Sequence, residues 1–560
     1  MMDIRTPSER GAPNRFFHRL RQEAKAFLPP ETAYWVVVWL VLMGAGRDRL
    51  FQDPGTFWHL AWGHQMLQTG QIPRVDQFSF TRAGQPVVAD QWLAELLMAL
   101  VHRLAGWEGL LLLVATGLAW LYGWMGGRLV RAGIGPLWAA GVLATVFLAS
   151  AHNFHVRPLI ATLILQGLWF DGLLAVEAGE RPIRQLWIFV PVSVLWANLH
   201  GGLLAGLGTL TLCAVLWLLL GSLTGKGPAR SAAQGFHLAA LTAASWMAVL
   251  LNPYGLDLPR TWYATLTMNL GRWIQEHRPW TPQQPAGWAA MGLGAVYLGL
   301  LMRAVRRGEF RAVWTMPIVW FLLGLRCVRH LPLFAEMTAL TIADLTLAGR
   351  KGSSNGNLQP IQRVMSTGWP LGGSAPPDGA GISRADREHS GNPSFSAGGK
   401  WRKYLLPVVL VGASLALQMA GWPAPLVGAG WVRFSPERWP VGLLRDLQAA
   451  CRSEPEGAKI FNDLDFGGWV IYFTLCFRVF IDDRCALYGE EFLAAYEESR
   501  RHRPAQLDQW QREYGFQWAL VRRDSSWDRY LASQSRWQCL GRDQAAACYR
   551  RRGPERFDAR

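Results

Sequence analysis

Cysteine is scarce in this chain, and the usual motifs of soluble enzyme chemistry are missing. Only 7 of the 560 residues are cysteines, and no Cys-x-x-Cys pair or His/Cys ligand spacing predicts a zinc site. No P-loop, G-x-G-x-x-G or G-x-S-x-G stands in the context that gives it a function, so soluble nucleotide and hydrolase chemistry are not expected. No small-residue cleavage site follows the first apolar run, which predicts a retained anchor rather than a signal peptide.

Long apolar runs are abundant instead. Hydrophobic residues make up 51% of the chain, which carries 30 tryptophans, and this is too apolar for an ordinary soluble enzyme. The sequence predicts a mainly α-helical, polytopic membrane protein with about eleven to twelve transmembrane helices. The runs cover residues 34–45, 107–127, 134–151, 158–176, 186–199, 202–223, 236–251, 286–302, 313–325, 331–347 and 404–419.

The distribution of charge predicts the orientation in the membrane. The net charge of +16 is compatible with nucleic-acid binding, but the basic residues cluster in alternate loops, as the positive-inside rule requires. We therefore expect no nucleic-acid partner. The same pattern predicts that the C-terminal part lies outside the cytoplasm. The basic groups include Arg128, Arg131, Arg181, Arg184, Lys226, Arg230, Arg303, Arg306, Arg307 and Arg311.

One apolar segment leaves the number of spans open. Residues 92–104 are apolar but few, and they include Glu95, His102 and Arg103. Counting this segment as a span would put the basic loops outside the cell. We interpret it as a half-helix or interfacial helix, which gives eleven spans. A twelve-span alternative would invert the chain downstream.

Composition divides the chain into five parts. A basic cytoplasmic tail, 1–32, precedes a transmembrane domain, 33–347, whose first outer loop is 47–91. Residues 348–402 are rich in Gly, Ser, Pro and charge, which predicts a disordered linker. The last span, 403–420, leads to a soluble α/β domain, 430–560. In that domain we expect strands at 459–461, 478–481 and 518–521 and helices at 490–500 and 526–533.

Five of the seven cysteines lie in the C-terminal domain. Cys539 and Cys548 flank Gly541-Arg-Asp-Gln544 and would face each other across a hairpin, where a disulfide would satisfy the geometry. A disulfide would suit an oxidising compartment. The alternative is that both are buried free thiols.

A short helix is predicted after the first apolar run. Asp53 suits its N-cap, Pro54 its first position and Gly70 its end. An amphipathic helix of this kind is expected to lie in the membrane interface. Its apolar face consists of Phe57, Leu60, Ala61, His64 and Leu67.

Polar residues gather at the predicted outer ends of the spans. Charged groups next to lipid are costly and usually face a cavity or a partner, so these residues predict a basic, histidine-rich pocket around the helix that follows Asp53. Its cations would hold the phosphate of a lipid-linked substrate, and a carboxylate would accept a proton from a hydroxyl. The residues are His152, Asn153, His155, Arg157, Asn198, His200, Asn252, Glu276, His277, Arg278, Arg326, Arg329 and His330.

Each of these residues also has a structural interpretation. Asp53 can be a helix cap alone, and Arg157 can mark a helix start with its guanidinium at the lipid headgroups. Asn198 and His200 can hydrogen-bond between helices, and Glu276 can belong to a solvated pair in its loop. The face that they share is a stronger indication than any single residue.

Several segments match motifs of one family. They are Asp53-Pro-Gly-Thr-Phe-Trp-His-Leu60, Gly70-Gln-Ile-Pro-Arg-Val-Asp-Gln-Phe-Ser-Phe-Thr81, Gln91-Trp-Leu-Ala-Glu95, Trp196-Ala-Asn-Leu-His-Gly201, Leu251-Asn-Pro-Tyr-Gly255, Phe461-Asn462 and Phe480-Ile-Asp-Asp-Arg484. Across nearly the whole chain outside the linker, the sequence resembles bacterial polytopic membrane proteins that are grouped with GT-C-type glycosyltransferases.

The resemblance implies a GT-C-like fold and a role for Asp53. GT-C enzymes include oligosaccharyltransferases and protein O-mannosyltransferases, which carry an acidic residue in the first outer loop, where a polyprenyl-phosphate-linked sugar is transferred. By that similarity Asp53 would be the general base. The family often has a second acidic residue two positions later, where this chain has Gly55. Asp76, Asp90 or Glu276 would have to take its place.

Together these observations predict a membrane glycosyltransferase that moves a sugar from a polyprenyl-phosphate donor to an envelope acceptor. Its partners would be that donor and membrane lipid. No metal ligand is identified, and a divalent metal cofactor stays open. The alternative, favoured by the missing acid at position 55, is a non-catalytic assembly or transport factor for envelope polysaccharide. The predicted catalytic residues are Asp53, Asp76 and Glu276, and the predicted phosphate-binding residues are His155, Arg157, His200, Arg329 and His330.

Overall fold

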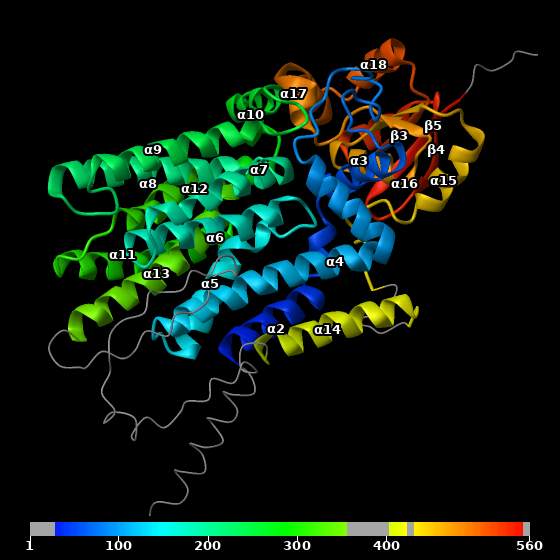
Figure 1. The fold of residues 1–560 in the computed structure, drawn as a ribbon. Coiled ribbons are helices and arrows are strands. Elements are labelled where there is room, and N and C mark those ends of the chain that lie inside the picture. The colour runs from blue at the N-terminus through cyan, green and yellow to red at the C-terminus, as the bar shows by residue number, and fades with distance from the viewer. Residues whose placement is uncertain (1–28, 355–401, 423–430, 553–560) are drawn as a thin grey trace, which may run out of the picture.

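All the apolar runs fold into helices. The computed structural model describes residues 29–354, 402–422 and 431–552, and Figure 1 shows a long helical bundle with a smaller globular part at one end. Every one of the eleven runs coincides with a helix. These helices are α2 Pro30–Met43, α4 Trp92–Arg131, α5 Pro136–Ser150, α6 Leu159–Glu177, α7 Phe189–Leu199, α8 Leu203–Thr224, α9 Ala232–Met247, α11 Pro285–Arg306, α12 Met316–Arg326, α13 Leu331–Ser354 and α14 Arg402–Met419.

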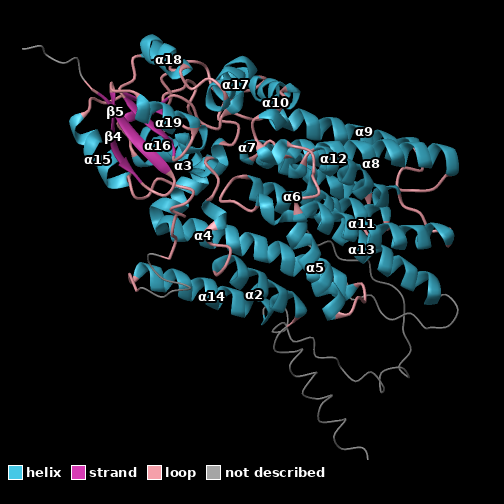
Figure 2. Cartoon of the chain, turned by 180° about the vertical axis from the view of Figure 1, so that it is seen from behind, coloured by secondary structure: helices cyan, strands magenta, loops and turns pink. Residues whose placement is uncertain are grey.

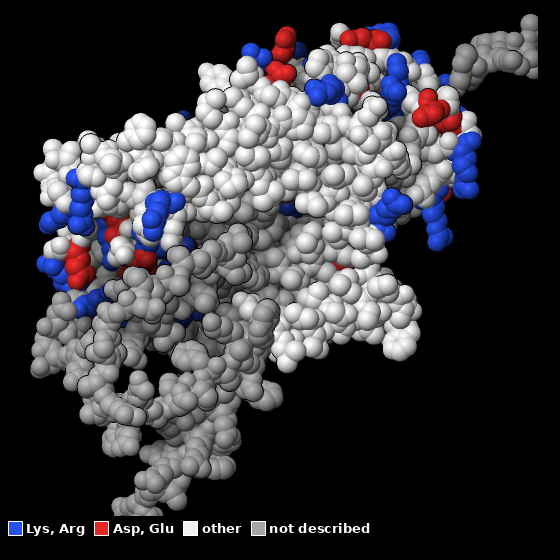
Figure 3. Space-filling model, viewed as in Figure 1, with Lys and Arg blue, Asp and Glu red and all other residues white. Residues whose placement is uncertain are grey.

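The bundle has the dimensions of a membrane domain. Six of the described helices are long and apolar enough to cross a bilayer, and four shorter ones are also apolar. On the face drawn in Figure 3, charged side chains gather at two ends and leave a broad, largely uncharged band between them. The chain is a multi-pass membrane protein. Whether it has eleven or twelve spans stays a prediction.

Ion pairs join helices at the end of the bundle far from the sheet. Arg128 of α4 lies 2.6 Å from Asp171 of α6, and Arg311, just before α12, lies 2.6 Å from Asp344 of α13. Both arginines belong to the loops that the charge pattern predicts to be cytoplasmic. The basic loops and the C-terminal part therefore lie at opposite ends of the bundle, as Figure 1 also shows.

Helix α4 is broken where the sequence left the number of spans open. Gly106 has φ 62° and ψ −157°, and it separates the expected short helix from the expected span. This conformation favours glycine because a side chain would be strained there. Residues 92–104 thus form a distinct helical arm that approaches the C-terminal part.

Helix α3, Gly55–Thr69, is an interior helix, which corrects the prediction of a helix on the membrane surface. Phe57, Trp58 and Trp62 are all buried, because α3 is covered by α4 on one side and by α16, Gly467–Phe473, on the other. Of the predicted apolar face, Phe57 and Leu60 are buried and the other three residues are half-buried, whereas Trp62 and Met66 outside that face are buried as well.

The C-terminal part is built on a mixed five-stranded sheet, drawn in magenta in Figure 2. The strand order is β2-β1-β3-β5-β4, with β1 parallel to β2 and β3, and β5 antiparallel to β3 and β4. The strands are β1 Ala458–Asn462, β2 Phe477–Val479, β3 Trp518–Arg522, β4 Trp537–Arg542 and β5 Ala546–Arg551, and the helices around them are α15 Leu444–Ser453, α16, α17 Cys485–Arg501, α18 Gln506–Tyr514 and α19 Ser526–Ser533.

The loop before α4 extends this sheet beyond β2. The backbone N–H of Val479 donates to the carbonyl oxygen of Phe78 at 2.9 Å, and the N–H of Phe80 donates to the carbonyl oxygen of Val479 at 3.0 Å. The edge of β2 is thereby covered. The C-terminal part is thus attached to the membrane domain through backbone hydrogen bonds.

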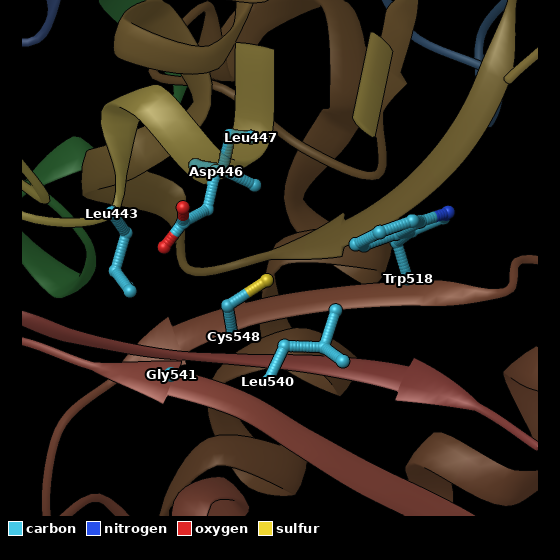
Figure 4. Close-up of a pocket in the computed structure, with 7 residues that line it drawn as sticks. All are labelled: Leu443, Asp446, Leu447, Trp518, Leu540, Gly541 and Cys548. Atoms are coloured by element: carbon cyan, nitrogen blue, oxygen red, sulfur yellow. The ribbon is translucent and has the colours of Figure 1, made fainter. Parts of the chain in front are cut away.

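The disulfide lies elsewhere than the sequence suggested. Cys451 and Cys476 are bonded, whereas Cys539 and Cys548 are free. A bulge pairs Cys548 with Gly541 and Cys539 with Tyr549, so the two cysteines do not face each other. Cys548 instead lines a small pocket of about 240 Å³ between α15 and the sheet, shown in Figure 4.

Two predicted segments lie largely outside the described residues. Most of the basic tail 1–32 precedes residue 29, and residues 355–401 of the predicted linker 348–402 are not described. The start of the linker was placed too early, because α13 continues to Ser354.

Candidate active site

Asp53 lies in the turn before α3 and has two polar partners. Its Oδ1 accepts the backbone N–H of Gly55 at 2.7 Å, and its Oδ2 lies 2.8 Å from Nη1 of Arg157. The carboxylate therefore does cap the helix start, although the N-cap position itself is Pro54. Its ion pair with Arg157 gives it a second role.

Four charged residues from separate loops form one cluster beside α3. Nη1 of Arg157 lies 3.3 Å from Oε1 of Glu276, and Nη1 of Arg329 lies 2.8 Å from the same oxygen. Glu276 thus bridges the two guanidinium groups, and Asp53 binds the first of them. The side chains are largely buried, with 11% exposure for Asp53 and 21% for Arg329. Glu276 and Arg329 are carried by the short helices η6 Gln275–His277 and η8 Val328–His330.

The two arginines fix the charge of the neighbouring groups. Burial would raise the pKa of Glu276, but the guanidinium groups of Arg329 and Arg157 outweigh it and hold the pKa below its usual range. Burial, followed by the charge of Arg329, lowers the pKa of His277 to about 4. At neutral pH Glu276 is therefore ionised and His277 is neutral.

A fifth member of the cluster, Asp483, comes from the C-terminal part. Its Oδ1 accepts the indole N–H of Trp58 at 2.8 Å. Its Oδ2 lies 3.2 Å from where a Cβ on Gly55 would stand, and Oδ1 of Asp53 lies 2.7 Å from the same point. No pattern in the sequence indicates a functional role for Asp483. Its only indication was the family motif Phe480-Ile-Asp-Asp-Arg484.

Arg484 attaches the loop that carries Asp483 to the membrane domain. Its Nη1 lies 2.8 Å from Asp76, and its Nε and Nη2 donate to Asp482 at 2.8 and 2.6 Å. The guanidinium also lies 5.1 Å from the ring centroid of Trp62. Asp76, predicted as a catalytic candidate, is buried in this contact and has its partners outside the Asp53 cluster.

Of the predicted histidines, His277 lies against the arginines, with its Nε2 3.1 Å from Nη1 of Arg329, whereas His155 and His330 contact backbone oxygens. His155 lies between the carbonyl oxygens of Arg49 and His152, 3.2 Å from each. Nδ1 of His330 lies 3.4 Å from the carbonyl oxygen of Leu323, on the side of α12. These contacts are to backbone oxygens, so the binding of phosphate by His155 and His330 stays a prediction.

His200 is held by hydrogen bonds within the bundle. Its Nδ1 accepts from the backbone N–H of Gly202 and lies 2.9 Å from Oγ1 of Thr162. That hydroxyl already accepts from the indole of Trp196, so it donates to His200. The proton of the neutral ring therefore sits on Nε2.

No metal centre is evident in the part of the chain that the structure describes. Within residues 29–354, 402–422 and 431–552, no group of three or more His, Cys, Asp or Glu side chains is arranged to hold a metal ion. The cluster is instead composed of paired carboxylates and guanidinium groups.

Solved structures share the architecture. The oligosaccharyltransferase of Archaeoglobus fulgidus, tethered to an acceptor peptide with an NVT sequon, matches 88% of this chain and 69% of its own with a TM-score of 0.51 and 12% identity. Its apo form matches the same shares with a TM-score of 0.51 and 11% identity. The chain has a GT-C-type membrane fold. This confirms the predicted fold class.

Comparisons of the sequence with protein families and curated proteins give no information beyond the GT-C-type fold. No protein-family model and no curated protein matches the chain. ArnT from Cupriavidus metallidurans, in a structure bound to undecaprenyl phosphate, matches 92% of this chain and 97% of its own at 14% identity, with a lower TM-score of 0.44. The reaction that this chain performs must therefore be inferred from its own side chains.

Proposed function

We propose that this protein is a membrane glycosyltransferase that transfers a sugar from a polyprenyl-phosphate donor to a hydroxyl acceptor of the cell envelope. The observation that supports this most is the cluster of Asp53, Arg157, Glu276 and Arg329 at one end of a GT-C-type bundle. It combines two carboxylates with two guanidinium groups, and these are the kinds of group that proton abstraction and phosphate binding require.

The two arginines are the proposed phosphate ligands. Arg157 and Arg329 both contact Oε1 of Glu276, so their charged groups face a common point. A phosphate would compete with Glu276 and Asp53 for these guanidinium groups, and bidentate binding makes arginine well suited to it. Glu276 then serves to hold the two arginines together before the donor binds.

Asp53 is the proposed general base. As the acceptor oxygen forms its bond to the anomeric carbon, its proton passes to the carboxylate of Asp53. The bond between that carbon and the phosphate oxygen breaks, and its electron pair leaves with the polyprenyl phosphate. When the phosphate engages Arg157, the ion pair between Arg157 and Asp53 is broken, which frees the carboxylate to accept the proton of the acceptor.

We also propose that the cluster faces the periplasm of a bacterial inner membrane. The basic loops lie at the opposite end of the bundle, and the positive-inside rule assigns them to the cytoplasm. The disulfide between Cys451 and Cys476 supports an oxidising compartment for the C-terminal part. The donor's phosphate would then be reached at the outer membrane surface.

Substitution of Asp53 tests the proposal. Asp53→Asn keeps an oxygen that can accept the N–H of Gly55, so the helix start should persist, whereas Asp53→Ala also removes the cap, at about 1 kcal/mol. If Asp53 is the base, both variants lose about 10²–10⁴-fold in sugar transfer. The measurement is release of undecaprenyl phosphate from a panel of undecaprenyl-phosphate-linked sugars by the full chain in lipid nanodiscs.

A matched control uses a carboxylate outside the cluster. Asp257 is exposed and pairs with Arg260 at the start of α10, Asp257–Thr267, so Asp257→Asn should leave transfer unchanged. Full activity in Asp53→Asn would reduce this residue to a helix cap. It would favour the alternative, a non-catalytic assembly or transport factor for envelope polysaccharide.

A further inference from the structure

Two carboxylates from different parts of the chain meet above Gly55. A Cβ at this position would stand 2.7 Å from Oδ1 of Asp53 and 3.2 Å from Oδ2 of Asp483. The space that a side chain at position 55 would occupy is therefore bordered by both acids. Asp53 and Asp483 are 430 residues apart in the sequence, and they come together only because the C-terminal part is packed against α3.

The two carboxylates have unequal surroundings. Asp53 accepts the N–H of Gly55 and pairs with the guanidinium group of Arg157. Asp483 accepts one neutral indole N–H, from Trp58, while its charged neighbours include the carboxylate of Asp482. Burial, then the charges of Asp53 and Asp482, raise the pKa of Asp483, and Arg157 offsets them only in part.

The loop that carries Asp483 is fixed at the carboxyl end of β2. Oδ1 of Asn462 accepts the N–H of Phe480 at 2.8 Å, and its Nδ2 donates to the carbonyl oxygen of Ile481 at 2.7 Å. On the other side, a Cβ on Gly467 would stand 2.4 Å from that same carbonyl oxygen, so α16 packs directly against the loop. Asp483 is thus presented to Asp53 by rigid elements rather than by a flexible loop.

We propose that Asp53 and Asp483 act as a carboxyl pair that shares one proton across the two parts of the molecule. Asp53 is the ionised member that takes the proton of the acceptor, and Asp483 is the neutral member that donates a hydrogen bond to the phosphate. This inference rests on the proposed glycosyl transfer and assigns a second catalytic residue to it.

The chemistry gives each carboxyl group a distinct task. Cleavage of the bond from the anomeric carbon to the phosphate oxygen turns a phosphodiester monoanion into a phosphomonoester with a second negative charge. A neutral carboxyl group can stabilise that new charge by a hydrogen bond, and an ionised one cannot. Two carboxyl groups whose surroundings separate their protonation states are the usual basis of such a division of roles.

Amide substitutions distinguish the two members. An amide can donate a hydrogen bond but cannot accept a proton, so Asp483→Asn should stay within about tenfold of the wild type, whereas Asp483→Ala should lose about 10²–10³-fold. Asp53→Asn should lose about 10²–10⁴-fold. The assay is release of undecaprenyl phosphate from the same panel of linked sugars, by the full chain in nanodiscs, with Asp257→Asn as control.

A second measurement does not depend on turnover. The infrared band of a protonated carboxyl group should be present in the wild type at neutral pH. Because other carboxyl groups, such as that of Glu336, are buried as well, Asp483→Asn should lose only the component of this band that Asp483 contributes, and Asp257→Asn should keep it. Absence of such a change would overturn the assignment of the proton to Asp483, whatever the panel of donors shows.

The outcomes separate this inference from the proposed function. Equal loss in Asp483→Asn and Asp483→Ala, with Asp53→Asn inactive, would show that Asp483 is needed in ionised form and would overturn the pair while leaving the transferase intact. Wild-type activity in Asp483→Ala would overturn it as well. Full activity in Asp53→Asn would instead contradict the proposed function itself.

Discussion

At the scale of single residues, the cluster combines groups that stabilise the fold with one that opposes it. Glu276 is ionised between two guanidinium groups, and its pKa is held low by them after the cost of burial. Asp483 has a raised pKa, chiefly from burial and then from Asp53 and Asp482. A carboxyl group whose pKa is raised by folding lowers the free energy of unfolding at pH values above its pKa in the unfolded chain.

The raised pKa of Asp483 gives a prediction about stability. Its stabilising contribution is fully present below the pKa of an unfolded Asp, about 3.9, and is lost as pH rises through the higher folded value. Asp483→Asn removes this dependence, so the variant should have a higher Tm than the wild type at neutral pH, and the difference should shrink on acidification. The exposed Asp446, changed to Asn, is the control.

Thermal unfolding of the detergent-solubilised chain at several pH values provides the measurement. A lower Tm for Asp483→Asn than for the wild type at neutral pH would contradict the raised pKa of Asp483. It would mean that Asp483 is ionised in the folded state and that a partner stabilises its charge.

Part of this cluster could be predicted from the sequence. Asp53, Arg157, Glu276 and Arg329 all stand at helix ends, and the alternation of basic loops places these ends on one side. Asp483 could not be predicted in this way, because its position depends on how the C-terminal part packs on α3. We predicted His330 in the pocket because it stands at a helix end, but its ring lies against the carbonyl oxygen of Leu323.

At the scale of elements, the site depends on close helix crossings around α3. A Cβ on Gly63 would stand 2.0 Å from the carbonyl oxygen of Glu95 in α4, and one on Gly468 of α16 would stand 2.2 Å from the carbonyl oxygen of Pro54. Both glycines let backbones touch where a side chain would force them apart. The second crossing holds the C-terminal part directly against the residue that follows Asp53.

Gly468→Ala should therefore loosen the contact between α16 and the start of α3. Because the carbonyl oxygen of Pro54 belongs to the backbone and cannot rotate away, we expect a loss of about 1–3 kcal/mol in stability, as in other overpacked sites. Transfer activity should fall as well, since Asp483 moves away from Asp53. Thermal unfolding and the transfer assay measure the two effects.

Gly412 offers a matched control in α14, where an added Cβ would meet nothing within 4 Å. Gly412→Ala should be neutral or slightly stabilising, by up to about 1 kcal/mol of helix propensity. An unchanged Tm in Gly468→Ala would show that the two elements are not in firm contact.

The elements themselves were largely predictable, and their partners were not. The apolar runs gave all eleven bundle helices because length and hydropathy are local properties. The surface placement of α3 was wrong because periodicity reveals an apolar face but not what covers the other one. The predicted disulfide between Cys539 and Cys548 was wrong. A bulge in β4 sets its register with β5, and the spacing of the cysteines does not reveal that bulge.

At the scale of the whole molecule, the site lies where the membrane domain meets the C-terminal part. Asp53 and Arg157 belong to the membrane domain, and Asp483 and Arg484 belong to the loop after β2 in the C-terminal part. Arg484 joins the two through Asp76, and backbone hydrogen bonds from Val479 to the loop before α4 add to the attachment. A substrate with its phosphate at the membrane surface would meet groups from both parts at once.

The most direct test of this account is a structure of the full chain in a lipid nanodisc with undecaprenyl phosphate. The account predicts that the phosphate contacts the guanidinium groups of both Arg157 and Arg329, in competition with Glu276, and lies beside the carboxyl groups of Asp53 and Asp483. A lipid whose phosphate lies at the basic loops of the opposite end, or away from both arginines, would contradict it.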